Sequence, residues 1–215
     1  MPKVADHPSE HENYLLQSFR RKAGGLTNAP PRDQTDIWLF WAQHHGLPTR
    51  LLDWSESALA ALYFAVNLGG KGPRVYALDP IKLNEYSFGP RTDELNYPLS
   101  WHGKGKQNIA LAWEERSTTL SYALPVAMPA TYFDERMIAQ RSCFTVHGKL
   151  KPMKKLLEEE HIEVSECLHE YQITDNPYEM VAIMHDLDLL GTSGATLFPD
   201  LDHLAGDIRK ELIGL

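Results

Sequence analysis

The sequence predicts a mixed α/β (α+β) fold, in which a small central β-sheet, mixed or split, is flanked by helices. Apolar residues recur at helical spacing in several segments, and short β-branched or aromatic runs lie between these segments. Glycine and proline residues separate the two kinds of segment. The chain has 215 residues, of which 43% are hydrophobic and 23% charged, so it can bury one good core. We therefore expect a single domain over residues 1–215.

The first part of the chain reads as helix, helix, strand, helix, strand. The limits of these segments come from capping residues, from the Gly24-Gly25 and Gly69-Gly70 pairs, and from Pro48, which excludes helix at the preceding residue. Asp53 or Ser55 is the expected cap of the third helix. The predicted strands are 50–52 and 74–78. The predicted helices are 11–23, one that begins near 33–36 and ends near Gly46, and one that runs from its cap to Gly69-Gly70.

The second part begins with a polar, irregular stretch that predicts a long loop over 84–119. The two prolines of the segment 125–130 predict an edge strand, because proline cannot donate to a central ladder. Asp134 is expected to cap a short helix that leads into a strand over 142–146. The remaining expected elements are a strand over 169–173 and helices over 154–160, 178–189 and 202–212.

Charge and composition exclude several classes of protein. A formal net charge of −8 argues against bulk nucleic-acid binding, which depends on clustered Lys and Arg. No apolar run reaches the roughly 20 residues that cross a bilayer, and the N-terminal residues lack the apolar centre of a signal peptide. The only cysteines, Cys143 and Cys167, have no metal-site or redox-pair spacing, which indicates a reducing compartment. We expect a cytoplasmic protein that binds no membrane.

The segment from Gln43 to Ser55 concentrates the side chains that could carry chemistry. Arg50 offers a planar fork for a phosphate or carboxylate, and Trp54 offers a face for a planar ring. Ser55, at a predicted helix start, lies where anions bind backbone N–H groups. These properties suit a nucleotide. The predicted binding residues are His44, His45, Thr49, Arg50, Asp53, Trp54 and Ser55.

A structural interpretation of the same residues stays open. Asp53 can be a helix cap that also pairs with Arg50, Trp54 can fill the core, and His44 can bond a carbonyl group at a helix end. No metal site is expected at His44-His45, because neighbouring residues of a helix point about 100° apart.

Two further alternatives lie outside this segment. Cys143 could be a nucleophile, although its apolar strand favours a buried thiol. The acidic residues Asp200 and Asp202 could bind a cation, although a capped helix explains them more simply.

Residues 43–55 read Gln-His-His-Gly-Leu-Pro-Thr-Arg-Leu-Leu-Asp-Trp-Ser, and residues 60–65 read Ala-Ala-Leu-Tyr-Phe-Ala. Together these runs closely resemble the signature of the FRG domain family. The stretches 136–145 and 195–202 agree with it, so the resemblance extends over roughly residues 10 to 210. One departure is clear. The family is named for a Phe-Arg-Gly motif on an early strand, whereas this chain has only Phe19-Arg20-Arg21, inside a predicted helix. We therefore expect the strand with that motif to be absent.

The resemblance implies a fold similar to that of ADP-ribosyltransferases and, by analogy, an NAD-dependent effector or toxin in bacterial toxin–antitoxin or phage-defence systems. NAD would be the substrate, and the residues implied as catalytic are Arg50, Ser55 and Gln140. Since an amide cannot act as a base, the nearby Glu135 is a further candidate. The implied partners are an antitoxin or operon partner and a macromolecular acceptor. The alternative is a non-catalytic module that senses a nucleotide or binds a partner.

Overall fold

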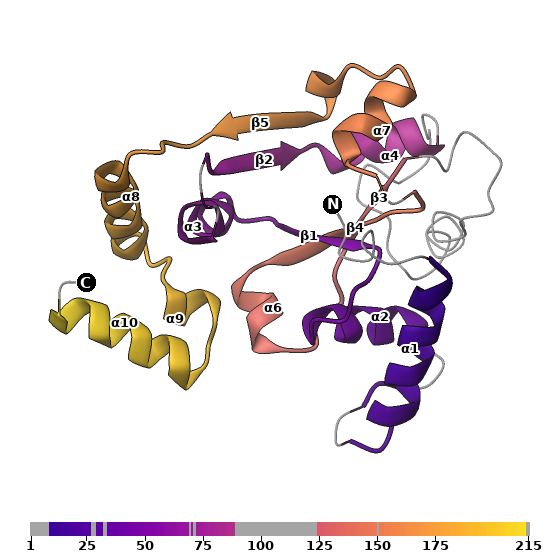
Figure 1. Cartoon of the computed structure of the whole chain (residues 1–215), viewed down its shortest axis with the longest axis horizontal. Coiled ribbons are helices and arrows are strands. Elements are labelled where there is room, and N and C mark those ends of the chain that lie inside the picture. The colour runs from indigo at the N-terminus through magenta and orange to yellow at the C-terminus, as the bar shows by residue number, and fades with distance from the viewer. Residues whose placement is uncertain are drawn as a thin grey trace. The chain divides into compact units, whose positions relative to one another are not determined.

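The computed structural model confirms a mixed α+β fold with two small sheets and flanking helices (Figure 1). Likeness to ADP-ribosyltransferases stays a prediction. One sheet has three strands in the order β1-β4-β3, and the other has two strands, β2 and β5. The structure describes residues 9–26, 29–31, 34–68, 70, 72–88, 124–149 and 151–213.

The chain divides into two compact units, each built from three stretches of sequence. The strands β1 (Leu51–Ser55) and β4 (Ser142–Val146) each contribute residues to both units. The prediction of one domain over residues 1–215 stays a prediction. Unit 1 consists of residues 1–53, 79–131 and 144–167, and unit 2 consists of residues 54–78, 132–143 and 168–215.

Unit 1 begins with two helices, α1 (Ser9–Ala23) and α2 (Thr35–His44). Phe19 of α1 meets Trp38 and Trp41 of α2 edge-on, with ring centroids 6.2 Å apart in both pairs. On another face of α2, Phe40 stacks on Phe144 of β4 at 4.9 Å. Aromatic pairs of this kind add to the stabilisation from area burial alone. They hold the end of α2, and with it Gln43, in a defined place.

The other elements of unit 1 surround the edge strand β3 (Val126–Pro129). The helix α4 (Pro80–Phe88) presents Asn84, whose side-chain amide donates to the Ala127 carbonyl at 2.9 Å and accepts from the Ala127 N–H at 2.8 Å. The pair of bonds replaces the ladder partner that β3 lacks beside this residue. The unit also contains α7 (Met153–Glu159) and a short 3-10 helix (Val164–Glu166).

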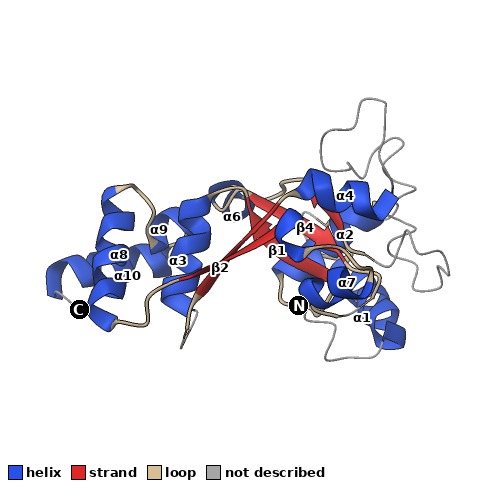
Figure 2. Cartoon of the chain, turned by 90° about the horizontal axis from the view of Figure 1, so that it is seen from above, coloured by secondary structure: helices blue, strands red, loops and turns tan. Residues whose placement is uncertain are grey.

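Unit 2 is formed by helices around a two-stranded antiparallel sheet of β2 (Arg74–Leu78) and β5 (Leu168–Gln172). Its helices α3, α8, α9 and α10 lie side by side (Figure 2). Ala60, Tyr63, Leu187 and Leu197 form their buried core. The helices of the unit are α3 (Ala58–Leu68), α6 (Glu135–Ala139), α8 (Pro177–Leu189), α9 (Gly194–Leu197) and α10 (Leu201–Ile213).

Space is tight at the start of α9. A Cβ atom added to the buried Gly194 would lie 2.9 Å from Asp207 Oδ1 and 3.2 Å from the Tyr63 hydroxyl oxygen. The first distance is shorter than any normal contact, so a side chain here would force the Asp207 carboxylate to move. Ser193 and Thr196 exchange side-chain and backbone hydrogen bonds in a capping box that fixes the first turn of α9.

Most predicted elements are confirmed. β2 and β4 (Ser142–Val146) have the predicted limits, Asp134 caps α6, and β3 lies at an edge of its sheet. Phe19, Arg20 and Arg21 lie inside α1, as predicted. No helix among the described residues is long and apolar enough to cross a membrane.

Two predictions are wrong in their details. The loop expected from residue 84 begins later, because α4 continues to Phe88; residues 89–119 of that expected loop lie outside the described residues. The cap of α3 is neither Asp53 nor Ser55, since both belong to β1 (Leu51–Ser55). The Ser57 hydroxyl accepts from the Ala60 N–H at 3.3 Å and takes the capping role.

Candidate functional site

The predicted site residues fall into two groups, one in each compact unit. His44, His45, Thr49, Arg50 and Asp53 belong to unit 1, and Trp54, Ser55 and Gln140 belong to unit 2. The structure therefore brings residues together within each group.

The unit 1 group is organised by the side-chain amide of Gln43, at the end of α2. Its Nε2 donates to Asp53 Oδ2 at 2.7 Å, and its Oε1 accepts from the Thr49 hydroxyl at 2.6 Å. The Thr49 hydroxyl also accepts from the Leu51 N–H at 3.2 Å. Because Gln43 and Thr49 are buried, these bonds satisfy polar groups that water cannot reach. The chain of bonds ties α2 to the start of β1.

Arg50 lies inside unit 1, with only 4% of its surface exposed. Its carbonyl group accepts from the His147 N–H at 3.0 Å, next to β4. A guanidinium group at this depth is shielded from water, and a buried charge of this kind is normally paired. This placement agrees with the structural interpretation of Arg50.

His147 is a buried polar residue beside Arg50 that the sequence did not single out. Its Nε2 lies 3.0 Å from the Thr145 hydroxyl, while its buried Nδ1 has no hydrogen-bond partner. Burial is the main cause that lowers the pKa of His147 to about 3, and the positive charge of Arg50 contributes in the same direction. The ring is therefore neutral at physiological pH. A histidine that follows an apolar strand gives no signal of such an environment in the sequence.

His44 and His45 lie at the end of α2, with His44 half-buried and His45 exposed. Their rings are perpendicular, with centroids 5.1 Å apart, and His45 also meets Trp41 edge-on at 5.6 Å. These contacts place both rings in the aromatic surroundings of α2. Within the described ranges, no group of three His, Cys, Asp or Glu side chains could hold a metal ion.

The unit 2 group centres on the turn between β1 and α3. The Ser55 hydroxyl donates to the Gln140 carbonyl at 2.7 Å and accepts from the Ser57 N–H at 3.0 Å. The Glu56 N–H donates to the Arg141 carbonyl at 3.0 Å, and the Arg141 guanidinium lies 3.4 Å from Glu56 Oε2. The end of β1 and the turn after α6 are thus joined by three separate contacts. We call Ser55, Glu56, Gln140 and Arg141 the turn site.

Arg141 adopts a backbone conformation that is uncommon for a residue with a side chain. Its φ angle is +48°, in the left-handed region that favours glycine. This conformation ends α6 and directs the carbonyl groups of Gln140 and Arg141 toward Ser55 and Glu56. The local strain is therefore coupled to the geometry of the turn site.

Glu56 is the exposed carboxylate of the turn site. It contributes to the pKa shifts of two neighbours in the same unit. Burial is the larger cause, and the charge of Glu56 the next, of the raised pKa of Tyr132. The same two causes raise the pKa of Cys143 to about 11. Cys143 is therefore a neutral thiol at physiological pH, which argues against its role as a nucleophile. Sequence reasoning missed Glu56 and favoured Glu135, which lies exposed in the first turn of α6.

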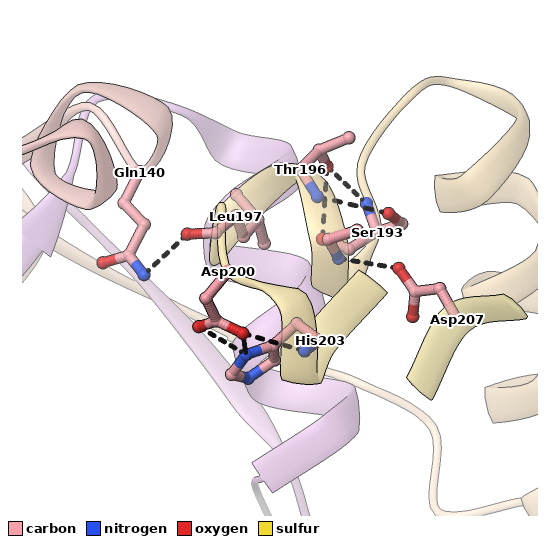
Figure 3. A network of polar contacts seen from close by, with 8 residues as sticks. Gln140, Ser193, Thr196, Leu197, Asp200, His203 and Asp207 are labelled. Atoms are coloured by element: carbon pink, nitrogen blue, oxygen red, sulfur yellow. Dashed lines mark hydrogen bonds and ion pairs between the residues drawn. The ribbon is translucent and has the colours of Figure 1, made fainter. Parts of the chain in front are cut away.

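The Gln140 side chain points away from the turn toward α9, where its Nε2 donates to the Leu197 carbonyl at 3.1 Å (Figure 3). Beyond Leu197, the Phe198 ring stacks on His203 at 4.3 Å, and the Arg136 guanidinium lies 4.7 Å from the centre of the Phe198 ring. Gln140 is therefore a bridge between the turn site and the α9 region.

Two predicted residues remain. Trp54 is half-buried within β1, so part of its ring stays accessible. Asp200, considered above as a cation ligand, caps α10 by accepting from the His203 N–H at 2.8 Å. Its carboxylate also lies 2.8 Å from His203 Nδ1 (Figure 3). These contacts support the capping interpretation.

Comparison with known proteins gives one match. The model of the FRG domain family matches residues 2–71, which include α1, α2, β1, α3 and the beginning of the turn site. The later stretches 136–145 and 195–202, which supported the resemblance, lie outside the matched range. Neither a curated protein nor a solved structure matches the chain.

Proposed function

The chain carries an FRG domain over residues 2–71, and from this premise we propose that it is an ADP-ribosyltransferase-like effector that acts on NAD at the turn site. The reaction would transfer ADP-ribose to a macromolecular acceptor, in a bacterial toxin–antitoxin or phage-defence setting. The observation that carries the proposal is the 2.7 Å hydrogen bond between the Ser55 hydroxyl and the Gln140 carbonyl. It joins the segments of Ser55 and Gln140, two of the residues that the resemblance to ADP-ribosyltransferases implies as catalytic.

The local structure of the middle segment supports this assignment. Ser55 ends a strand, Ser57 caps the following helix, and the helix is rich in alanine, contains Phe64-Ala65 and ends at Leu68. A strand that passes through a serine turn into an alanine-rich helix is the arrangement that the analogy requires. The analogy is one of fold, so the chemistry has to be argued from the side chains.

Glu56 supplies a group that the sequence interpretation lacked. Cleavage of a glycosyl bond passes through an oxocarbenium-like state, which a nearby carboxylate stabilises. The side chain of Glu56 is 52% exposed and lies on the same turn as Ser55, so a ribose bound there would meet a carboxylate. Arg141 keeps that carboxylate in place from 3.4 Å. Glu56 therefore replaces Glu135 as the proposed catalytic carboxylate.

The proposed step is a substitution at the anomeric carbon of the ribose that carries nicotinamide in NAD. The carbon–nitrogen bond breaks, its electron pair leaves with nicotinamide, and a nucleophilic group of the acceptor bonds to the same carbon. The proton that the acceptor loses passes to Glu56 or to water. Gln140 acts through its backbone as a positioning residue, since its amide cannot take a proton.

A second candidate function, a non-catalytic module that recognises a nucleotide or a partner, is favoured by a separate observation. The Gln140 amide already donates to Leu197, and Arg50 is buried in unit 1. Neither group is free to meet a substrate without rearrangement, so a binding role would need fewer changes than a catalytic one. Trp54 and Ser55 would then provide the ring-stacking and hydrogen-bonding parts of the recognition surface.

The test is incubation of the purified chain with labelled NAD and a bacterial lysate, with nicotinamide release and label transfer as readouts. Catalysis at the turn site predicts that Glu56→Gln abolishes both signals, while the matched variant Glu135→Gln retains them. Both variants should keep the wild-type melting temperature to within about 2 °C, because both positions are exposed.

Three outcomes would contradict the catalytic proposal. Nicotinamide release that survives Glu56→Gln would remove the turn site from the reaction. Saturable NAD binding by calorimetry, without any release, would support the non-catalytic module, and loss of that binding in Trp54→Ala would assign it to unit 2. Absence of both release and binding would contradict catalysis and NAD recognition alike, and would leave the module that binds a partner.

A further inference from the structure

The C-terminal helix α10 exposes a continuous apolar stripe. Leu201, Leu204, Ile208 and Leu212 are spaced three or four residues apart, so they lie along one side of the helix, with Ala205 between them. Leu201 and Leu212 are each 81% exposed, and Leu204 and Ile208 are 45% and 46% exposed. We call these five residues the α10 stripe. From its first to its last residue it extends about 16 Å along the helix axis.

The opposite side of α10 is polar, and it is this side that faces the rest of unit 2. His203 stacks on Phe198 at 4.3 Å, and Asp207 accepts from the Ala195 N–H at 2.7 Å. Burial opposes the ionisation of Asp207, but the Ala195 N–H and nearby Lys210 still lower the pKa of this carboxyl. A surface helix normally buries its apolar stripe and exposes its polar side. In α10 the two are reversed, which indicates that something else covers the stripe.

The charges beside the stripe indicate what covers it. Asp202 and Arg209 are both exposed and lie on the same flank of the stripe, seven residues apart along the helix. One is near the beginning of α10 and the other is near its end. An identical helix that lies antiparallel would place an arginine opposite each aspartate.

We propose that α10 pairs with α10 of a second copy of this chain, antiparallel, about a two-fold axis close to Gly206. In this register Leu204 faces Ile208 of the partner subunit, and Leu201 faces Leu212 of the partner subunit. Asp202 pairs with Arg209 of the partner subunit, and symmetry repeats each contact. The surface is self-complementary in both shape and charge, as a two-fold interface requires.

The expected dimer is weak and depends on concentration. A single pair of short helices buries less than the roughly 1,200 Å² of a standard stable interface. We therefore expect a dissociation constant on the order of ten micromolar. Because the Asp202–Arg209 pairs are exposed, salt should weaken the dimer only slightly.

The first test is sedimentation velocity of the full chain from about 1 to about 300 µM, a range that brackets the expected dissociation constant. Wild type should shift from monomer to dimer. Ile208→Glu should weaken association at least tenfold and leave the melting temperature unchanged. The matched control is Tyr178→Glu on α8, which places the same charge at an 87% exposed apolar residue outside the stripe and should leave the dimer intact.

A charge exchange tests the antiparallel register. Asp202→Arg alone and Arg209→Asp alone should each weaken the dimer, since each places like charges opposite one another. The double variant carrying both substitutions should restore it, because each copy again presents opposite charges. A chain that stays monomeric throughout the concentration range would overturn the proposal. A dimer that Ile208→Glu leaves intact would overturn it as well, and a dimer that the double variant fails to restore would overturn the antiparallel pairing.

Discussion

The two groups of predicted site residues differ in how they meet water. In unit 1, Gln43, Thr49 and Arg50 are all buried, and their polar atoms serve contacts inside the unit. In unit 2, the turn site keeps the Glu56 and Arg141 side chains more than half exposed. Adjacent stretches of one motif therefore lie in different environments. The first stretch is buried and hydrogen-bonded inside unit 1, and the second leads into a turn whose charged side chains are exposed.

This difference bears on how a dense polar motif should be interpreted. Hydrogen-bonding residues can cluster in sequence because a ligand needs them or because a buried turn must satisfy its own backbone. The buried group predicts losses of stability on mutation, whereas the exposed group predicts losses of function with little change in stability. Mutations in the two groups should therefore separate stability from function.

The largest expected effect is an acid destabilisation that originates at His147. Burial holds its folded-state pKa near 3, below the ordinary value of 6.5, so the folded chain resists protonation of this ring. The free energy of unfolding is therefore at its full value above pH 6.5 and decreases as the pH falls toward 3. The cause is that the His147 ring takes up a proton in the unfolded chain at a higher pH than in the folded chain. The loss should be about 4 kcal/mol over that window.

Urea unfolding of wild type and His147→Gln at several pH values measures this effect. The difference between the two free energies of unfolding should shrink as the pH falls, since glutamine does not titrate. His161→Gln, at an exposed histidine, serves as the control and should follow wild type. A constant difference between wild type and His147→Gln from pH 7 to pH 4 would show that His147 titrates normally.

The second prediction concerns Arg50. Arg50→Ala removes a buried guanidinium and leaves the groups around it without their partner, so we expect a loss on the order of 3 kcal/mol in the free energy of unfolding. Thermal and denaturant melts measure it. Arg21→Ala on α1 removes an exposed arginine and should change stability by less than about 0.5 kcal/mol. If Arg50→Ala melts like wild type but loses NAD binding, Arg50 belongs to a ligand site and the contrast between the units fails.

Much of the fold could be predicted because its elements have local causes. Asp134 caps α6 through the Met137 N–H at 2.9 Å, and the prolines of β3 put it at a sheet edge. The cap of α3 was misplaced because Asp53 and Ser55 are good capping residues in isolation. The sheet extends β1 to Ser55 and leaves that role to Ser57. Strand pairing therefore overrides the capping propensity of these two residues, and it is a long-range effect that the sequence does not reveal.

The types of residue at the candidate site could be predicted from the sequence, but the burial and the contacts of each residue could not. Ser55 and Gln140 were both chosen, and they are hydrogen-bonded although they are far apart in sequence. The roles of Glu56 and Arg141 could not be predicted, because both depend on the left-handed turn at Arg141. The burial of Arg50 and His147 was equally hidden, since a charged or polar side chain in a sequence is by default an exposed one.

The third prediction uses Thr49. Thr49→Val keeps the volume but removes the hydroxyl that serves Gln43 Oε1 and the Leu51 N–H, leaving both buried groups unsatisfied. The expected loss is about 2 kcal/mol in the free energy of unfolding. A double-mutant cycle with Gln43→Leu isolates the pair and should give a coupling of about 1 kcal/mol. Additive effects would mean that the bond contributes nothing and that the two residues are buried for other reasons.

The smallest expected effect on stability belongs to the turn site, and it is the sharpest test of the contrast. Ser55→Ala removes the hydroxyl that joins Gln140 to β1, but the Glu56–Arg141 backbone bond and ion pair remain, and water can reach the turn. We expect a loss of no more than about 1 kcal/mol. Hydrogen exchange at the amides of residues 140–142 should nevertheless quicken, because the turn has lost one of its hydrogen bonds.

Ser165→Ala is the control for a hydroxyl that supports no long-range contact, because the exposed Ser165 hydroxyl donates to Glu163, two residues away. A Ser55→Ala loss as large as that of Thr49→Val would place the turn site among the structural residues, and the chemistry proposed for Glu56 would then have to be sought elsewhere in unit 2.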